Sequence, residues 1–203
     1  MSIFKKILCM GLLCFLTACA TSHKKNDSEK QVNLKKEQTV LNNPLIDAKG
    51  FADDTLRALE VRQGRLLSEI DFVRMAQEKD TIILDARSVN RFAQAHVADA
   101  INLPFTEFSI ASLAKVVPNK HSRILIYCNN NFDTEPKSPQ YKNASEYLQA
   151  MKVAMFSKSV RSPLNLPTYV SLYSYGYDNI YELGVAINPL QTNIRFEGSL
   201  INQ

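Results

Sequence analysis

The chain has 203 residues, of which 45% are hydrophobic and 22% are charged, and its formal net charge is +4. These fractions are typical of a folded globular protein and exclude a disordered or fibrous chain. Its six glycines form none of the G-x-G-x-x-G, G-x-x-x-x-G-K and G-x-S-x-G patterns, which excludes dinucleotide-binding, P-loop and nucleophile-elbow sites of the usual kind.

Residues 1–18 have the pattern of a secretory signal peptide. Lys5 and Lys6 precede an apolar run, Ile7 to Leu16, that is too short to span a membrane as a helix. The run leads into Leu16-Thr17-Ala18-Cys19, which resembles a bacterial lipobox. The sequence therefore predicts removal of residues 1–18 and lipidation of Cys19. An ordinary cleaved signal is the weaker interpretation, because the leucine and both small residues fall where a lipobox needs them.

Residues 19–50 are expected to form a flexible tether behind the lipid. The stretch from Ala20 to about Asn43 is polar and charged and lacks apolar periodicity. A tether of about 25 residues reaches roughly 25–30 Å on average. Ala20 follows Cys19 where an aspartate would retain the protein at the inner membrane, by resemblance to enterobacterial sorting. We therefore expect a periplasm-facing protein, anchored by its lipid to the outer membrane.

The folded domain, residues 51–203, shows alternating helix and strand patterns. Short apolar runs predict buried strands at 66–67, 81–85, 100–103, 123–127 and 179–183. Helical patterns run from Ala52, with Asp53 or Asp54 as cap, from Ser68, from Thr106 to Val117, around 141–156, and from Thr168 to Tyr175. This alternation predicts an α/β fold with a parallel sheet covered by helices on both faces.

Cys128 directly follows the predicted strand 123–127. Functional residues of parallel sheets gather at the carboxyl ends of the strands. Because Cys9 and Cys14 leave with the signal peptide and Cys19 is lipidated, Cys128 is the only free thiol expected in the mature chain. Cys128 is therefore the first candidate for chemistry.

Three segments resemble the signatures of the rhodanese-like family. Asp85-Ala86-Arg87, Phe92 and then His96 to Pro104 resemble the signature D-x-R, F, G-H-I-x-G-A-x-N-x-P. The segment Ile124 to Cys128 resembles the strand that leads to the catalytic cysteine. The segment Tyr175 to Leu183 resembles the closing signature G-Y-x-N-V-Y-x-L. The three occur in the family's order and at suitable distances.

The resemblance covers about Leu66 to Pro189 and implies a five-stranded, mainly parallel sheet flanked by helices on both faces. Enzymes of this family carry sulfane sulfur as a persulfide on a loop cysteine, and Cys128 matches that nucleophile. They take sulfur from thiosulfate or a persulfide donor and pass it to a thiol or cyanide. Thiolate and persulfide are both anionic, so the chemistry calls for surrounding backbone N–H groups. The implied active-site loop comprises Asn129, Asn130, Asn131, Phe132 and Asp133.

The loop departs from the family pattern at its sixth position. Sulfurtransferases of the family commonly have arginine or another residue suited to the donor there, whereas this chain has Asp133. An acid near the sulfur would disfavour the thiolate and repel thiosulfate. Related phosphatases end a longer loop in arginine, but Thr134 stands there, so we expect poor phosphatase activity. The three asparagines suit either an anion-binding nest or a plain structural turn.

An insertion at about 133–167 separates this loop from the helix expected at Thr168. The insertion is rich in lysine and arginine, and Lys158 or Arg161 is a candidate to replace the missing loop cation, but a solvated helix face is the stronger interpretation of each. Among the signature residues, the resemblance implies structural roles for Asp85 and Arg87, which tie loops together by charge-assisted hydrogen bonds. We also expect His96 to be a hydrogen-bonded structural residue.

Three functions remain open from the sequence. The first is an envelope sulfurtransferase that uses Cys128, with a small sulfur donor and a thiol acceptor. The second is a non-catalytic rhodanese-like module that binds a protein or a small anion. The third is a thiol redox sensor, which the lack of a second thiol disfavours. We expect no cofactor, no metal, because histidine and cysteine are too few for a zinc cluster, and no nucleic acid.

Overall fold

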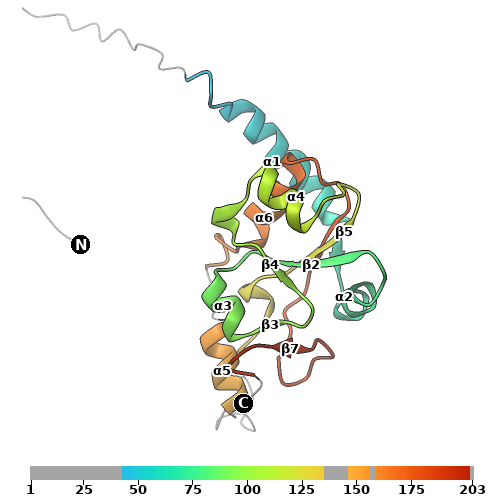
Figure 1. The fold of residues 1–203 in the computed structure, drawn as a ribbon, viewed down its shortest axis with the longest axis vertical. Coiled ribbons are helices and arrows are strands. Elements are labelled where there is room, and N and C mark those ends of the chain that lie inside the picture. The colour runs from blue at the N-terminus through green and yellow to red at the C-terminus, as the bar shows by residue number, and fades with distance from the viewer. Residues whose placement is uncertain (1–42, 135–145, 156–158, 202–203) are drawn as a thin grey trace, which may run out of the picture. The chain divides into compact units, whose positions relative to one another are not determined.

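The computed structural model describes residues 43–134, 146–155 and 159–201 (Figure 1). The expected signal peptide, Cys19, most of the tether and Lys158 lie outside the described residues. Within the described ranges, no helix is both long and apolar enough to cross a membrane.

A five-stranded parallel sheet forms the centre of the domain, as predicted. Its middle strand, β5, carries Ile124, Leu125 and Ile126, all with no exposed surface. Such a continuous apolar run is typical of a strand covered on both faces. In spatial order the strands are β1 (Leu66–Leu67), β6 (Ile180–Leu183), β5 (Arg123–Ile126), β2 (Thr81–Asp85) and β4 (Ile101–Asn102).

Helices cover both faces of this sheet (Figure 1). One face packs against α1 (Ala48–Gln63), α4 (Ile110–Val116) and α6 (Asn165–Ser174). The other packs against α2 (Glu69–Ala76) and α5 (Glu146–Ala154), and α3 (Val89–Gln94) lies beside α5.

Side chains of β5 alternate between the two cores. Ile124 and Ile126 belong to the core under α1, α4 and α6, whereas Leu125 and the following Tyr127 belong to the opposite core. Successive side chains of a strand point to opposite faces, so one strand supplies both cores. Each buried aliphatic side chain contributes roughly 1.5–3 kcal/mol to the free energy of unfolding. The two cores hold β5, and therefore Cys128, in a rigid position.

Several helix starts differ from the sequence predictions. Helix α1 begins at Ala48, within the expected tether, because the Asp47 side chain accepts a hydrogen bond from Gly50 N at 2.7 Å and caps the helix. The expected helix from Thr106 to Val117 is divided into a 3-10 turn, η1 (Phe105–Glu107), and α4, which Ser109 caps. Local capping side chains decide these boundaries, and apolar periodicity does not reveal them.

The C-terminal segment forms a second sheet that the sequence did not predict. Strands β3 (His96–Val97) and β7 (Phe196–Glu197) pair antiparallel. Strands of two residues are too short to show an alternating pattern. This pairing brings the chain end against the segment that follows α3.

Candidate active site

Cys128 lies at the carboxyl edge of the sheet, two residues after the end of β5. It caps the 3-10 turn η2 (Asn129–Asn131), and only 1% of the residue is exposed. It belongs to the lining of a cleft of about 370 Å³, which Arg87, Phe105 and Leu164 also line. The thiol is therefore a buried wall of a ligand-sized cleft.

Backbone N–H groups from two separate segments act on the Cys128 sulfur. Asn130 N donates a hydrogen bond to Sγ at 3.4 Å, and the N–H groups of Leu164 and Asn165 also favour the anionic form. The latter two belong to the start of α6, where backbone N–H groups have no partner within the helix. A helix N-terminus also carries a partial positive charge that favours an anion.

Burial of the Cys128 thiol has the opposite effect on its pKa to that of these N–H groups. Desolvation raises the pKa of the Cys128 thiol above its ordinary value of 9.0, and the nearby Glu182 carboxylate raises it further. The hydrogen bonds from Asn130, Asn165 and Leu164 lower this pKa, but burial is the largest effect. The resting thiol is therefore protonated at neutral pH.

We predict slow alkylation of Cys128 at neutral pH, because only the thiolate is the nucleophile. The pKa is raised, so the thiolate fraction is smaller than that of an unfolded cysteine at every pH below the ordinary value. At pH 7 to 8 the rate with iodoacetamide should be lower than after unfolding in urea, and it should rise about tenfold per pH unit. A rate plateau near neutral pH in the folded protein would contradict this prediction.

The asparagines after Cys128 have different surroundings. Asn131 is buried, and its Oδ1 accepts a hydrogen bond from Cys128 N at 2.9 Å while its Nδ2 donates to Leu183 O at 2.6 Å. It therefore ties the loop to the end of β6. Asn129 and Asn130 line the cleft, and Asn129 Oδ1 accepts from Arg87 at 3.3 Å.

Phe132 and Asp133 do not belong to the residues that line this cleft. The Phe132 ring is buried and packs edge-on against Tyr127 and Phe196. Asp133 N donates to Ile187 O at 2.8 Å. Six residues counted along the chain end at Asp133, whereas the N–H groups of Leu164 and Asn165, at the start of α6, act on the sulfur.

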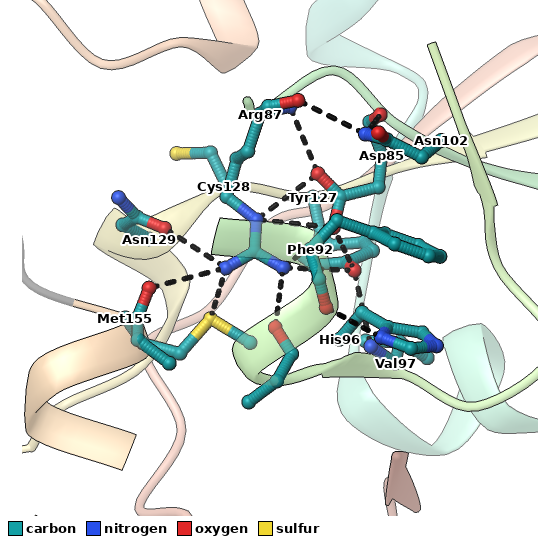
Figure 2. Close-up of polar contacts among 12 residues, drawn as sticks. Asp85, Arg87, Phe92, His96, Val97, Asn102, Tyr127, Cys128, Asn129 and Met155 are labelled. Carbon is teal, nitrogen blue, oxygen red and sulfur yellow. Dashed lines mark hydrogen bonds and ion pairs between the residues drawn. The ribbon is translucent and has the colours of Figure 1, made fainter. Parts of the chain in front are cut away.

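Arg87 is the centre of a buried polar network beside the cleft (Figure 2). Its Nη2 lies 2.6 Å from Asp85 Oδ2, and both residues are at most 3% exposed. Tyr127 donates its hydroxyl proton to the same carboxylate. Burial and the Asp85 charge raise the pKa of Tyr127 well above its ordinary value, so the phenol keeps this proton. Further guanidinium hydrogen bonds reach Ala95 O, Asn129 Oδ1, Ala154 O and Met155 Sδ.

His96 lies outside the cleft lining. Its Nδ1 is 2.7 Å from Phe92 O, and its ring stacks on the Phe92 ring with centroids 3.7 Å apart. Its Nε2 lies 3.9 Å from a carboxylate oxygen of Glu197 in β7. These contacts join α3 to the small sheet β3–β7 (Figure 2 shows the His96 and Phe92 rings).

The sequence profile of the rhodanese-like domain matches residues 69–183, more than half of the chain. This chain belongs to the rhodanese-like domain family. Among solved structures, a protein of Bacillus halodurans is 14% identical, with 73% of this chain and 88% of that chain covered and a TM-score of 0.43. The rhodanese-like domain of an Anabaena protein, studied by solution NMR, is 17% identical, with 68% and 83% covered and a TM-score of 0.41. No curated protein matches.

Among the described residues, the cations that line this rhodanese-like cleft come from the segment after β2. Arg87 and Arg91 line it, whereas Arg161 is exposed and does not. Arg91, from α3, donates to Gln94 Oε1 at 3.2 Å and to Val153 O. Arg91 follows the D-x-R signature by one helical turn, a spacing that would have placed it near the site.

Sequence reasoning also missed Leu164, Asn165 and Glu182, all of which influence the pKa of Cys128. No motif marks the first two, because they begin a helix after an insertion. Glu182 lies within the closing signature, but at a position that the signature leaves open.

Proposed function

We propose that this rhodanese-like protein is a sulfurtransferase that carries sulfane sulfur as a persulfide on Cys128. The observation that supports this most is the set of three backbone N–H groups around Sγ, from Asn130, Leu164 and Asn165, in a cleft of about 370 Å³. Such groups stabilise anionic sulfur without a cationic side chain. Family membership supports the same reaction class.

The proposed reaction has two displacement steps. With thiosulfate as donor, the Cys128 thiolate attacks the outer sulfur, a new S–S bond forms, and sulfite leaves with the electrons of the broken S–S bond. An acceptor thiolate then attacks the terminal sulfur of the persulfide, and Cys128 leaves as thiolate. A persulfide donor reacts in the same way with a thiolate as leaving group. The thiol proton of Cys128 passes to solvent before the first step.

Charge around the cleft favours an anionic donor. Arg87 and Arg91 line the cleft, and Asp133, the acid expected to repel thiosulfate, does not. The guanidinium of Arg87 is paired with Asp85. The first step requires deprotonation of a thiol with a raised pKa, so sulfur loading should become faster as pH rises through the alkaline range.

Intact-mass analysis of residues 20–203 tests this proposal. Incubation with thiosulfate, or with a persulfide donor, should add one sulfur atom, and prior alkylation of Cys128 should prevent the gain. Reduction should remove the added sulfur. Failure of both donors to load a folded protein whose Cys128 can be alkylated would overturn the proposal.

That negative outcome would favour the second candidate, a non-catalytic rhodanese-like module that binds a small anion or a protein. The observation behind it is the 1% exposure of Cys128 together with its raised pKa, since both reduce reactivity. The same burial disfavours a redox sensor, because oxidation follows thiolate character and exposure.

We further propose that a lipid on Cys19 holds the protein at the periplasmic face of the outer membrane. The lipobox-like segment Leu16 to Cys19 and Ala20 after it support this location. Fractionation of cells should find the full chain with membranes and the Cys19→Ser variant in another fraction. Equal membrane association of both would contradict lipidation.

A further inference from the structure

The two segments that face the Cys128 sulfur are not neighbours in the chain. Asn130 precedes the insertion, and Leu164 and Asn165 follow it. A continuous loop would hold these N–H groups together through its own backbone. Here that backbone path is long, and closing a long path costs conformational entropy. Non-covalent contacts must therefore hold the start of α6 against the sulfur.

Two buried asparagines make the first of these contacts. Asn131 Oδ1 accepts from Cys128 N at 2.9 Å and from Asn165 Nδ2 at 3.1 Å. One oxygen thus joins the cysteine backbone to the first residue of α6. Asn131 and Asn165 are 7% and 5% exposed, so water does not compete for these bonds.

Glu182 makes the second contact. Asn165 Nδ2 also donates to Glu182 Oε1 at 2.8 Å. Because both neighbours of this nitrogen are acceptors, the amide orientation of Asn165 is defined, and its Oδ1 has no hydrogen-bond partner among the described residues. A buried acceptor without a partner is costly, so the two bonds of Nδ2 must compensate.

Arg62 holds Glu182 in place from α1. Glu182 is 3% exposed, and its two carboxylate oxygens lie 2.5 Å from Nε and Nη2 of Arg62. This fork-shaped pair fixes the direction of the carboxylate as well as its charge. A buried carboxylate without such a cation would be strongly unfavourable.

We propose that Glu182, held by Arg62, is a positioning residue for Cys128: through Asn165 it clamps the start of α6 onto the loop and so closes an active site that the insertion has interrupted. The clamp reaches the sulfur only through Asn165 and Asn131. Glu182 and Arg62 themselves do not line the cleft.

The charge of Glu182 also acts on the thiol. The titratable or charged groups around Cys128 come from β6, α1, the end of β2, α3 and the end of β5, and they are Glu182, Arg62, Asp85, Arg87, Arg91 and Tyr127. Among them, the charge of Glu182 raises the pKa of Cys128 and so opposes the thiolate. Its position and its charge therefore have opposite effects on the anion, which allows the two to be separated by experiment.

The test compares alkylation of Cys128 across pH in three variants. Asn165→Leu removes both clamp bonds, and we expect alkylation at pH 8 to be slower by about threefold or more, because the start of α6 no longer faces the sulfur. Glu182→Gln keeps an acceptor for Asn165 but removes the negative charge, and alkylation should be faster by about threefold or more. Arg62→Lys keeps the cation but loses the fork-shaped pair, so its alkylation rate should lie between those of Asn165→Leu and the wild type.

Controls separate the clamp from a general loss of stability. Arg57→Gln and Glu60→Leu change exposed residues of α1 and should leave the pH profile unchanged. If Asn165→Leu does not fold, Asn165→Ala makes the same comparison. A residue that acted on stability alone would shift Asn165→Leu and Glu182→Gln in the same direction. That result, or an unchanged profile in a folded Asn165 variant, would overturn the inference.

A second readout of the clamp, the rate of sulfur loading, rests on the proposed sulfurtransferase function. The alkylation profiles do not. If the wild-type protein gains sulfur, the Asn165→Leu variant should gain it about tenfold more slowly, since the clamp stabilises the anion formed in that step. If wild type gains no sulfur, the alkylation profiles still test the clamp. Failure of the clamp and failure of the proposed function are therefore distinguishable.

Discussion

Replacing Cys128 by serine should abolish the gain of sulfur from thiosulfate and from a persulfide donor. A serine hydroxyl does not ionise near neutral pH and forms no S–S bond, so no carrier remains. The substitution should leave the fold intact, because the hydroxyl oxygen can accept the hydrogen bond that Asn130 N donates to Sγ. Intact mass before and after incubation measures the gain, and the melting temperature checks the fold.

Cys128→Ala serves as a second variant, because it removes the acceptor as well as the thiol. Neither variant should gain sulfur, even if one of them has a lower melting temperature than the other. If Cys128→Ser gained sulfur as the wild type does, the sulfur would have to reside elsewhere, and the assignment of Cys128 as carrier would be wrong.

Replacing Asp85 by alanine should lower the free energy of unfolding by about 3–5 kcal/mol. Asp85 has no exposed surface and pairs with Arg87, which is 3% exposed. Without the carboxylate, a buried guanidinium loses its counter-ion and Tyr127 loses the acceptor of its hydroxyl proton. Urea unfolding at neutral pH measures the change.

Asp53→Ala is the matched control. Asp53 also forms an ion pair, with Lys49 four residues earlier in the chain, but this pair lies at the surface. Its side chain is 40% exposed and that of Lys49 is 85% exposed. Such a pair contributes about 0.3–0.5 kcal/mol, so this variant should be almost neutral. Similar losses in both variants would mean that the Asp85 network contributes no more than a surface pair.

The architecture of the domain follows from local sequence patterns. The run Ile124 to Ile126 predicts a strand covered on both faces, and the structure places it at the centre of the parallel sheet. Gly176, at φ +85°, ends α6 as expected, because glycine adopts this backbone conformation without strain. Helix starts were less predictable, since a cap such as Asp47 or Ser109 depends on one side chain rather than on a pattern.

The sequence by itself determined the fold class, the family and the position of Cys128 at the end of a central strand. These features depend on apolar periodicity and on motifs that are contiguous in the chain. The surroundings of the sulfur were decided by the tertiary structure. Proximity in sequence suggested Asp133, whereas the fold brings Asn165 and Glu182 toward the sulfur. Contacts across an insertion depend on how helices and strands pack, and no spacing along the chain encodes them.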